Sequence, residues 1–325
     1  MPKKWKRLYN EDCITGAKKY IKDDSVDLII TDPPYGINGD SFGKHYNRDN
    51  NQVLKGYKEV SNEEYPDFTR RWIKQAERVL RPGGSIYIIS GYSQLVHILN
   101  ALQENPTLKE INHLIWSYNF GVYTKKKFVS SHYHILYYVK KGGEKTFNTY
   151  SRYGHTEKDK KKKSENYKDR IDVFDIPKNF ERGKKKVINK LPEELITKLV
   201  QYSSNEGDVV CDFFLGGFTT ATVALKLNRK IVGFEKSKSI FKHFSKRVTK
   251  ALIGSGIDEL RIPDPSFPSN QGKKWTTDDI EYLLKHFDSL YPDKYGKLAS
   301  IKIIMEKMGR GYFSILNALK KHANY

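Results

Sequence analysis

Short apolar runs alternate, over most of the chain, with segments in which apolar residues recur at every third or fourth position. The runs predict strands at 26–30, 85–90, 111–118, 134–139, 209–213 and 230–234. The periodic segments predict helices at 68–80, 93–103, 193–202 and 219–227, and the polar segment 38–65 predicts a long loop. This alternation is typical of a mostly parallel sheet with helices on both faces, so we expect an α/β fold.

The C-terminal part of the chain has a different pattern. Residues 263–272 are rich in proline and serine, which predicts a linker. Three helical segments follow at 277–287, 298–308 and 312–322. We therefore expect an α/β domain over residues 1–262, a linker over 263–272 and a small all-α domain over 273–325.

The charge of the chain points to a polyanionic partner. Lys and Arg number 58 against 38 Asp and Glu, which gives a formal net charge of +20. Lys and Arg contacts to phosphates dominate nucleic-acid affinity, although a basic protein with no such partner is the alternative. Two cysteines far apart, with no zinc-ligand spacing, predict neither a disulfide framework nor a metal site. The N-terminus lacks a signal-peptide pattern, and no apolar run is long enough to span a membrane, so we expect a cytoplasmic protein.

The first candidate for chemistry is Asp32-Pro33-Pro34-Tyr35, directly after a predicted strand. Ligands of open α/β sheets bind beyond the carboxyl ends of strands. The Asp32 carboxylate and the Pro33 carbonyl are two hydrogen-bond acceptors that can polarise one amino group, and Tyr35 offers an aromatic face for a base. A rigid turn with a helix cap is the alternative interpretation of the tetrapeptide.

The second candidate is the segment from Cys211 to Thr220, which predicts a strand, a turn with Gly216 and Gly217, and a helix start. Such a turn lets the backbone approach a nucleotide-like ligand. The next predicted strand ends at Glu235, and an acid at that place is suited to hydrogen-bond a ribose diol. A tight turn with no ligand is the alternative.

With these motifs the sequence resembles the β class of DNA amino-methyltransferases, in which the catalytic motif precedes the cofactor motif. The resemblance runs from about residue 7 to 248 and rests on ordered matches: Asn10–Cys13, Ser25–Tyr35, Leu80–Gly84, Leu191–Leu195, Asn205–Asp212 and Gly233–Glu235. A dinucleotide oxidoreductase is disfavoured because the glycine turn lacks GxGxxG.

The resemblance implies a Rossmann-like methyltransferase sheet with S-adenosylmethionine as cofactor. It assigns the flipped target base to Asp32, Pro33, Pro34 and Tyr35. It assigns the cofactor to Asp12, Cys13, Asp32, Asp212, Phe214, Leu215, Gly216, Gly217, Thr219, Thr220, Glu235 and Lys236, with Asp12 near the adenine and Glu235 on the ribose. Neither cysteine is expected to act as a nucleophile, because direct transfer needs no covalent enzyme intermediate.

Two positions depart from the family pattern, which usually has glycine in place of Phe218 and proline in place of Phe213. A bulky residue at 218 is expected to avoid the left-handed backbone region, or the loop must take another shape.

The expected reaction is site-specific methylation of adenine N6 on a base flipped out of double-stranded DNA. Asp as the first residue of the tetrapeptide is commoner among adenine enzymes of the family. Methylation of cytosine N4 or of RNA is the alternative with the same fold. A catalytically silent DNA-binding protein is the alternative from another class. The sequence leaves open whether the chain forms a homodimer and whether a restriction partner accompanies it.

Basic segments mark the expected DNA contacts. The family places target recognition at about 120–190, where this chain carries Lys125, Lys126, Lys127, Lys184, Lys185 and Lys186 among aromatic residues. The opening of the C-terminal segment, 274–279, resembles a Myb- or SANT-like helical module. That resemblance implies a helix in the major groove, with phosphate contacts from Arg310, Lys320 and Lys321. A helical cap or protein-interaction module is the alternative.

Overall fold

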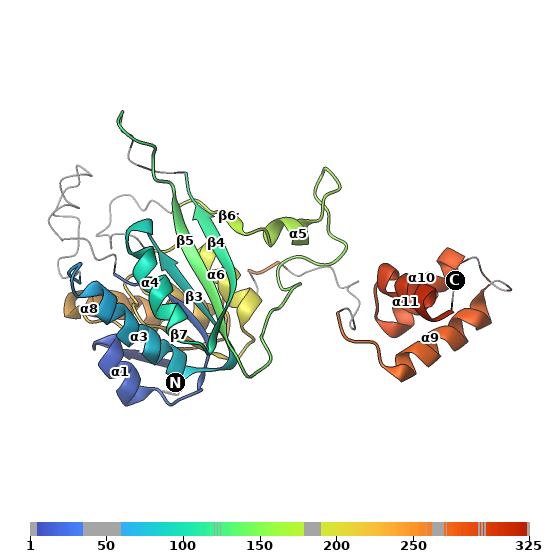
Figure 1. The fold of residues 1–325 in the computed structure, drawn as a ribbon, viewed down its shortest axis with the longest axis horizontal. Coiled ribbons are helices and arrows are strands. Elements are labelled where there is room, and N and C mark those ends of the chain that lie inside the picture. The colour runs from blue at the N-terminus through green and yellow to red at the C-terminus, as the bar shows by residue number, and fades with distance from the viewer. Residues whose placement is uncertain are drawn as a thin grey trace. The chain divides into compact units, whose positions relative to one another are not determined.

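The chain divides into two compact units. The computed structural model describes residues 5–34, 60–119, 121, 123, 125–178, 190–257, 259–261, 270, 272–291, 293, 295 and 297–323 (Figure 1). Unit 1 comprises Met1–Arg152 and Asp169–Arg261, and unit 2 comprises Tyr153–Lys168 and Ile262–Tyr325. The chain thus leaves unit 1 after Arg152, returns to it at Asp169 and leaves it again after Arg261.

Unit 1 contains the sheet. Its strands are β1 (Lys6–Tyr9), β2 (Val26–Thr31), β3 (Leu80–Ser90), β4 (Leu108–Ser117), β5 (His132–Lys140), β6 (Val173–Asp175), β7 (Val209–Asp212) and β8 (Lys230–Phe234). Its helices are α1 (Cys13–Tyr20), α3 (Tyr65–Val79), the 3-10 turn η2 (Tyr92–Gln94), α4 (Leu95–Gln103), α6 (Glu193–Ser203), α7 (Thr219–Lys226) and α8 (Lys238–Lys250). A short helix, α5 (Glu165–Asp169), lies where the sequence passes back from unit 2 to unit 1.

The eight described strands form one sheet in the order β1-β8-β7-β2-β3-β5-β4-β6. All neighbouring pairs are parallel except β3–β5 and β5–β4, so β5 alone runs against its neighbours among these strands. The carboxyl ends of β2, β7 and β8 therefore lie along one edge, and the loops that follow them meet there.

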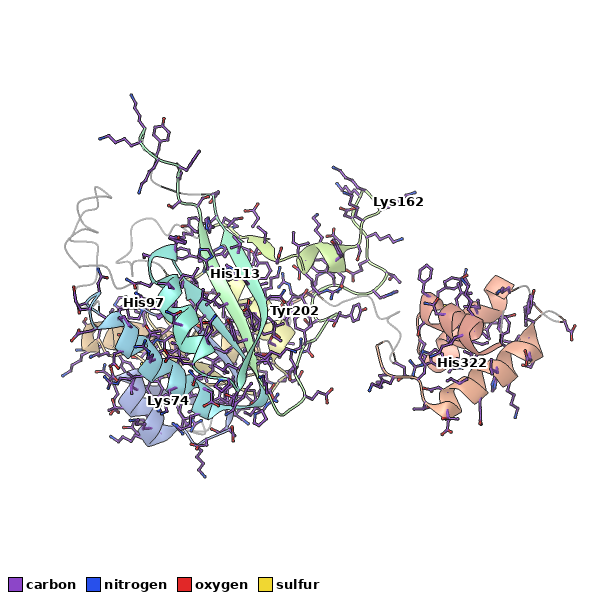
Figure 2. All side chains as sticks on the ribbon, viewed as in Figure 1. Lys74, His97, His113, Lys162, Tyr202 and His322 are labelled. Carbon is purple, nitrogen blue, oxygen red and sulfur yellow. The ribbon has the colours of Figure 1, made fainter. Side chains whose placement is uncertain are left out.

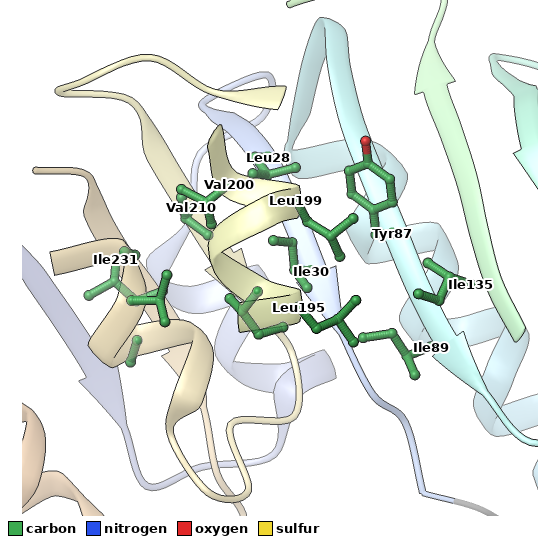
Figure 3. Packing of buried hydrophobic residues seen from close by; sticks show 14 of the residues in the cluster. Leu28, Ile30, Tyr87, Ile89, Ile135, Leu195, Leu199, Val200, Val210 and Ile231 are labelled. Atoms are coloured by element: carbon green, nitrogen blue, oxygen red, sulfur yellow. The ribbon is translucent and has the colours of Figure 1, made fainter. Parts of the chain in front are cut away.

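The sheet is covered on both faces. On one face Leu28, Ile30 and Ile231 pack under α6 and α7, as Figure 3 shows for Leu195, Leu199 and Val200 of α6. On the other face, alternate strand residues pack against α1, α3 and α4. Because successive side chains of a strand point to opposite faces, the continuous apolar run of β2 fills both layers.

Local sequence sets where the helices of unit 1 begin. Asp12 caps α1 by accepting hydrogen bonds from the backbone amides of Ile14 and Thr15. Ser237 caps α8 through the amide of Ile240. Both caps follow directly on the ends of strands, β1 and β8, so the first turns of α1 and α8 lie at the carboxyl edge of the sheet.

A buried polar network joins the two ends of the excursion 153–168. Arg152 Nε donates to Asp169 Oδ2 at 2.9 Å, and Tyr202 on α6 donates to the same oxygen at 2.5 Å. Lys198 Nζ lies 3.4 Å from Asp169 Oδ1. The position of Tyr202 on unit 1 can be followed in Figure 2. The Asp169 carboxylate thus pairs with two cations and a hydroxyl inside the protein, which fixes the points where the chain leaves and re-enters unit 1.

Unit 2 contains three helices that pack around their own apolar cluster: α9 (Thr277–Leu290), α10 (Lys297–Met308) and α11 (Tyr312–Ala323). Thr276 and Asp279 form a reciprocal capping box at the start of α9. Arg310 is 3% exposed; its guanidinium donates to the carbonyls of Lys273 and Lys274 and to Asp279, and lies 4.2 Å from the Trp275 ring centre. Arg310 therefore joins the segment before α9 to the start of α11.

The predicted fold class is confirmed: the sheet is mostly parallel, carries helices on both faces and is followed by a helical C-terminal segment. Every helix and strand predicted above is present, with ends shifted by a few residues. The elements β1, α1, α5, β6 and α8 were not predicted. Most of the predicted loop 38–65 and of the predicted linker 263–272 lies outside the described residues. None of the described helices is long and apolar enough to cross a membrane.

Candidate active site

A large cleft opens at the carboxyl edge of the sheet. Its volume is about 1280 Å³, and its wall includes residues that follow β1, β2, β7 and β8 together with the start of α3. All the residues that the family resemblance assigns to the cofactor line this one cleft: Asp12, Cys13, Asp32, Asp212, Phe214, Leu215, Gly216, Gly217, Thr219, Thr220, Glu235 and Lys236. Segments more than 200 residues apart in sequence thus meet in one place.

A buried hydrogen bond joins β2 to the loop that follows β7, residues 213–218, which carries the predicted cofactor motif and is called the cofactor loop below. Thr31, the last residue of β2, donates from Oγ1 to Asp212 Oδ1 at 3.0 Å. The amide of Phe214 donates to the same oxygen at 3.0 Å, which closes the turn after β7. Burial of Asp212 raises the pKa of its carboxyl to about 6, although the hydrogen bonds oppose this shift.

Glu235 holds the cofactor loop from the neighbouring strand end. Its Oε2 accepts from the amide of Gly216 at 3.1 Å, and its Oε1 accepts from the amide of Ser237 at 2.7 Å. Burial raises the pKa of the Glu235 carboxyl. Each carboxylate oxygen has a second lone pair, so both oxygens retain acceptor capacity towards a ligand in the cleft.

The first turn of α1 forms another wall. Asp12 uses Oδ1 to cap the helix, and its Oδ2 lies 3.7 Å from Lys236 Nζ. The side chain of Asn10 donates to the backbone carbonyl of Glu235 at 2.7 Å. These contacts connect the ends of β1 and β8, so Asp12 and Glu235 are held on adjacent strands at the same edge.

The cleft is acidic although the protein is strongly basic. Eight of its lining residues are acids, namely Glu11, Asp12, Asp32, Glu63, Glu64, Asp67, Asp212 and Glu235, against four bases, Arg71, Lys190, Lys236 and Lys238. Opposite charge near a bound group favours the charged form of that group. The cleft therefore suits a cationic ligand better than an anionic one.

Phe218 adopts the backbone conformation that the sequence analysis expected it to avoid. Its φ is 58° and its ψ 25°, in the left-handed region. That expectation is wrong, because packing holds the residue there: its ring is fully buried and contacts Phe241 and Phe244 of α8. Its amide donates to the Leu215 carbonyl at 2.6 Å. The loop thus keeps the conformation that glycine usually provides, with the ring turned into the core.

Phe213, the other departure from the family pattern, is also a core residue. It is 1% exposed and packs against Trp72 and Phe234. Phe214 instead lines the cleft, where its ring contacts Phe68 and Trp72 of α3. Of the two phenylalanines that follow β7, Phe213 therefore packs in the core and Phe214 lines the cleft.

The predicted catalytic tetrapeptide begins at the same cleft. Asp32 and Pro34 line it, and Pro33 is buried between them. Tyr35 lies outside the described residues, so its predicted contact with a base stays a prediction. Both cysteines are free and buried, and burial raises the pKa of each thiol well above its usual value, which suits residues without a nucleophilic role.

The start of α3 belongs to the cleft but was not predicted there. Glu64, Asp67, Phe68 and Arg71 line the cleft, and the Phe68 ring contacts Phe214 of the loop after β7. The sequence showed only the core-facing positions of this helix, since the polar positions carry no periodic signal of their own. Among the described residues, there is no group of three or more His, Cys, Asp or Glu side chains that could hold a metal ion.

The predicted DNA-contacting residues fall into three groups. Lys125, Lys126 and Lys127 are exposed in the loop between β4 and β5, and Lys320 and Lys321 are exposed near the end of α11. Lys184, Lys185 and Lys186 lie outside the described residues. Arg310 is buried and bonded within unit 2, so its position corrects the predicted phosphate contact and gives it a structural role.

Comparison with known proteins supports the same family. Type II methyltransferase M.BamHI of Bacillus amyloliquefaciens is 32% identical over 293 residues, which is 84% of this chain and 66% of that protein. Type II methyltransferase M.HpaI of Haemophilus parainfluenzae is 27% identical over 287 residues, with 84% of this chain and 85% of that protein covered.

Solved structures share the fold. The cytosine-N4-specific PvuII DNA methyltransferase superposes with a TM-score of 0.55 at 15% identity, over 80% of this chain and 95% of that one. TTHA0409 of Thermus thermophilus, complexed with S-adenosyl-L-methionine, gives a TM-score of 0.55 at 21% identity, over 76% of this chain and 95% of that one. The family of N6/N4 DNA methylases matches residues 26–246, which span the cleft residues that follow β2, β7 and β8 and most of α8. The chain belongs to this family of DNA methylases.

Proposed function

We propose that the protein is a site-specific DNA methyltransferase that transfers a methyl group from S-adenosylmethionine to N6 of an adenine in double-stranded DNA. The observation that carries this proposal is the hydrogen bond between Thr31 and Asp212. It joins the strand that leads into Asp32 to the loop of the cofactor motif, so acceptors for a base and a nucleotide-like site open into one cleft.

The cofactor of this family is S-adenosylmethionine, and the cleft has the character that this molecule needs. It exceeds the usual 300–1,000 Å³ range of small-molecule pockets, at about 1280 Å³, so it can admit a cofactor together with a substrate group. The excess of acids favours a molecule with a positively charged sulfur. The Gly216 turn would hold its methionine part, Glu235 its ribose, and Asp12 would lie near its adenine.

S-adenosylmethionine supplies an electrophilic methyl group. The protein must then make the amino nitrogen of the base a better nucleophile. The Asp32 carboxylate and the Pro33 carbonyl are the proposed acceptors of the two amino hydrogens, and Tyr35 is the proposed stacking partner of the base. Catalysis then consists of positioning and polarisation, which is consistent with the buried, protonated thiols of Cys13 and Cys211.

The adenine assignment rests on Asp as the first residue of the tetrapeptide, since the acceptors suit the amino groups of both bases. Cytosine N4 is the second candidate. For either base the target must leave the helix, at a cost of a few kcal/mol. The exposed Lys125–Lys127 segment, the rest of 120–190 and the surface of α11 are the proposed contributors of phosphate and base contacts.

The test is to express the protein in a methylation-deficient host and to sequence its DNA with modification-sensitive single-molecule reads. We expect N6-methyladenine in one recurring motif, and an Asp32→Ala control should leave the same motif unmodified. Detection of N4-methylcytosine would be consistent with the same mechanism and would change the assigned target base to cytosine. An unmodified genome with soluble protein would overturn the proposal. Calorimetry with S-adenosylmethionine would then separate a silent scaffold, which does not bind it, from an enzyme acting on RNA.

A further inference from the structure

The described residues of the segment 118–131, which joins β4 to β5, form a projecting hairpin whose two arms touch at the base. The amide of Tyr118 donates to the Ser131 carbonyl at 2.9 Å. Above this pair, a Cβ on Gly121 would lie 2.1 Å from Val129 Cγ1 and 2.7 Å from the Ser130 carbonyl oxygen, so only glycine permits this approach. Figure 1 shows the described part of this hairpin extending past the ends of β4 and β5.

The tip of the hairpin combines three lysines with bare aromatic rings. Lys125, Lys126 and Lys127 are exposed and are followed directly by Phe128. Phe128 is 98% exposed and Tyr123 is 77% exposed, and the value for Phe128 is the highest among the exposed large apolar side chains of the described residues. An isolated phenylalanine ring in water, held out by a narrow arm, contributes nothing to the core of unit 1.

The register of the sheet places this hairpin at the same edge as Asp32. Thr31 of β2 pairs with Ile88 of β3, and two residues later Ser90 of β3 pairs with His134 of β5. Asp32 therefore lies level with Ile135 of β5, and β4 and β5 continue to the pair Ser117–His132, three residues or about 10 Å further beyond the same edge. With strands about 4.8 Å apart, β5 lies about 10 Å to the side of β2.

The length of the hairpin suits a duplex placed over that edge. Seven residue steps separate Tyr118 from Lys125, and at about 3.3 Å per residue they can extend about 20 Å. A base that reaches the cleft at Asp32 has left its stack, and the duplex it came from must lie beyond the edge of the sheet. The hairpin projects into that space, to the side of the path that the base takes.

We propose that Phe128 is a wedge that enters the duplex and occupies the gap left by the flipped base, while Lys125–Lys127 contact the flanking phosphates. The proposal rests on the proposed function, because it needs a base that leaves the helix. Architectural DNA-binding proteins likewise insert apolar side chains between neighbouring base pairs. Phe128 is then a positioning residue: it stabilises the extruded base without touching the methyl group or its acceptor.

Charge favours DNA over an apolar protein surface as the occupant of this tip. Three adjacent lysines next to the ring would each lose hydration in an apolar interface, whereas phosphates on both sides of a base step would pair with them. In a duplex, an apolar stack of bases lies between two rows of phosphates. An apolar ring next to lysines is complementary to this arrangement, the ring to the base stack and the lysines to the phosphates.

The first experiment needs no recognition sequence. Phe128→Trp places a tryptophan at the tip, and the four native tryptophans of the unmodified protein supply the baseline. We expect the emission of Phe128→Trp to be quenched by a short duplex with one abasic site, where a gap already exists, and less by the intact duplex. Leu252→Trp is the matched control, because Leu252 is 64% exposed and the chain beside it bonds to the far end of α7. Equal response of the two variants would overturn the wedge.

The second experiment measures methylation of the motif found in the host genome. Phe128→Ala should lower kcat/KM by at least about tenfold on a fully paired target and by less than about threefold when the target base faces an abasic site. Phe128→Leu should retain most of the rate, because it keeps an apolar wedge. Equal loss on both substrates would contradict the proposal. If the genome is unmodified but the abasic duplex still quenches Phe128→Trp, the proposed function fails, and what remains is insertion of residue 128 at a gap in DNA without a flipped target base.

Discussion

Thr31 Oγ1 donates a hydrogen bond of 3.0 Å to Asp212 Oδ1 inside the protein, between the strand that carries the proposed base acceptors and the loop of the cofactor motif. Both side chains are buried, at 0% and 3% exposure. A buried carboxylate depends on each donor it has, so this contact fixes the separation of the two halves of the site.

Thr31→Val should remove that donor while it keeps the shape of the side chain. We expect the pKa of Asp212 to rise further and the protein to lose about 1–3 kcal/mol of unfolding free energy at pH 7, because a buried acceptor loses a partner. Urea unfolding measures the loss. Thr31→Ser keeps the hydroxyl and serves as control, and a Thr31→Val protein as stable as the Thr31→Ser protein would show that the hydrogen bond contributes nothing.

Stability should fall as pH rises through the range in which Asp212 loses its proton in the folded state. Its pKa is raised from 3.8 to about 6, so the folded chain binds a proton that the unfolded chain has already released. The stabilisation is complete below about pH 4 and lost above about pH 6, with a size on the order of 3 kcal/mol. Asp212→Asn should remove this contribution, and its unfolding free energy should decline less between pH 4 and pH 7 than that of the unmodified protein. Parallel curves for the two proteins would contradict the raised pKa.

Phe218→Gly should destabilise the protein although glycine suits the backbone conformation better. The strain relieved at a left-handed residue is about 1–2 kcal/mol, whereas loss of a buried phenylalanine costs about 3–5 kcal/mol. Thermal unfolding should therefore show a lower Tm. Phe218→Leu keeps the strained backbone and most of the side-chain volume. Its Tm should therefore lie between those of the unmodified protein and of Phe218→Gly. A more stable Phe218→Gly protein would mean that strain, and not packing, dominates this position.

Asp32→Ala should lower kcat at least about 100-fold, because an acceptor of the polarised amino group is lost. DNA affinity should stay within about threefold, since phosphate contacts from distant lysines dominate binding. Methyl transfer in single-turnover conditions and a DNA-binding titration test the two statements. The matched control is Asp67→Ala, an acid of the same cleft on α3, which should retain turnover. Full activity of Asp32→Ala would remove Asp32 from the mechanism.

Arg310→Ala should unfold unit 2 without unfolding unit 1. Arg310 is buried, and Asp279 and two carbonyls would lose its guanidinium as donor, at a cost of about 1–3 kcal/mol for each buried group left without a partner. Limited proteolysis should therefore cleave within 270–323 while the sheet unit survives. Lys320→Ala, at an exposed position of α11, is the control and should leave the proteolysis pattern unchanged.

Much of the fold followed from the sequence because the central strands are continuous apolar runs. The strand 230–234 was predicted to the residue, and the helices at the carboxyl edge to within a few residues. The elements that were missed have weak patterns for identifiable reasons. β1 has only four half-buried residues, and α8 interrupts its apolar positions with many cations. Propensity alone does not reveal an element that tertiary packing completes.

The candidate site also contains residues that the sequence could predict and residues that it could not. Asp32, Asp212 and Glu235 could be predicted to share a site because Asp212 ends a strand and the other two directly follow one, and the ends of parallel strands share an edge. Residues with roles set by packing were misjudged. Phe218 was expected to avoid a conformation that its burial maintains, and Arg310 was expected on a surface from which its hydrogen bonds remove it. Local sequence carries no record of such long-range compensation.

The reversed direction of β5 has an evolutionary consequence. In a fully parallel sheet the chain enters every strand at the amino edge, so each connection starts at the carboxyl edge and crosses back over the sheet. Because β5 runs against β4, their connection turns back at the catalytic edge itself. Residues inserted or deleted there leave the core untouched and cost only the slowly growing entropy of a longer loop. This one strand thus gives descendants of the fold a place where the proposed DNA contacts can change while the cleft stays the same.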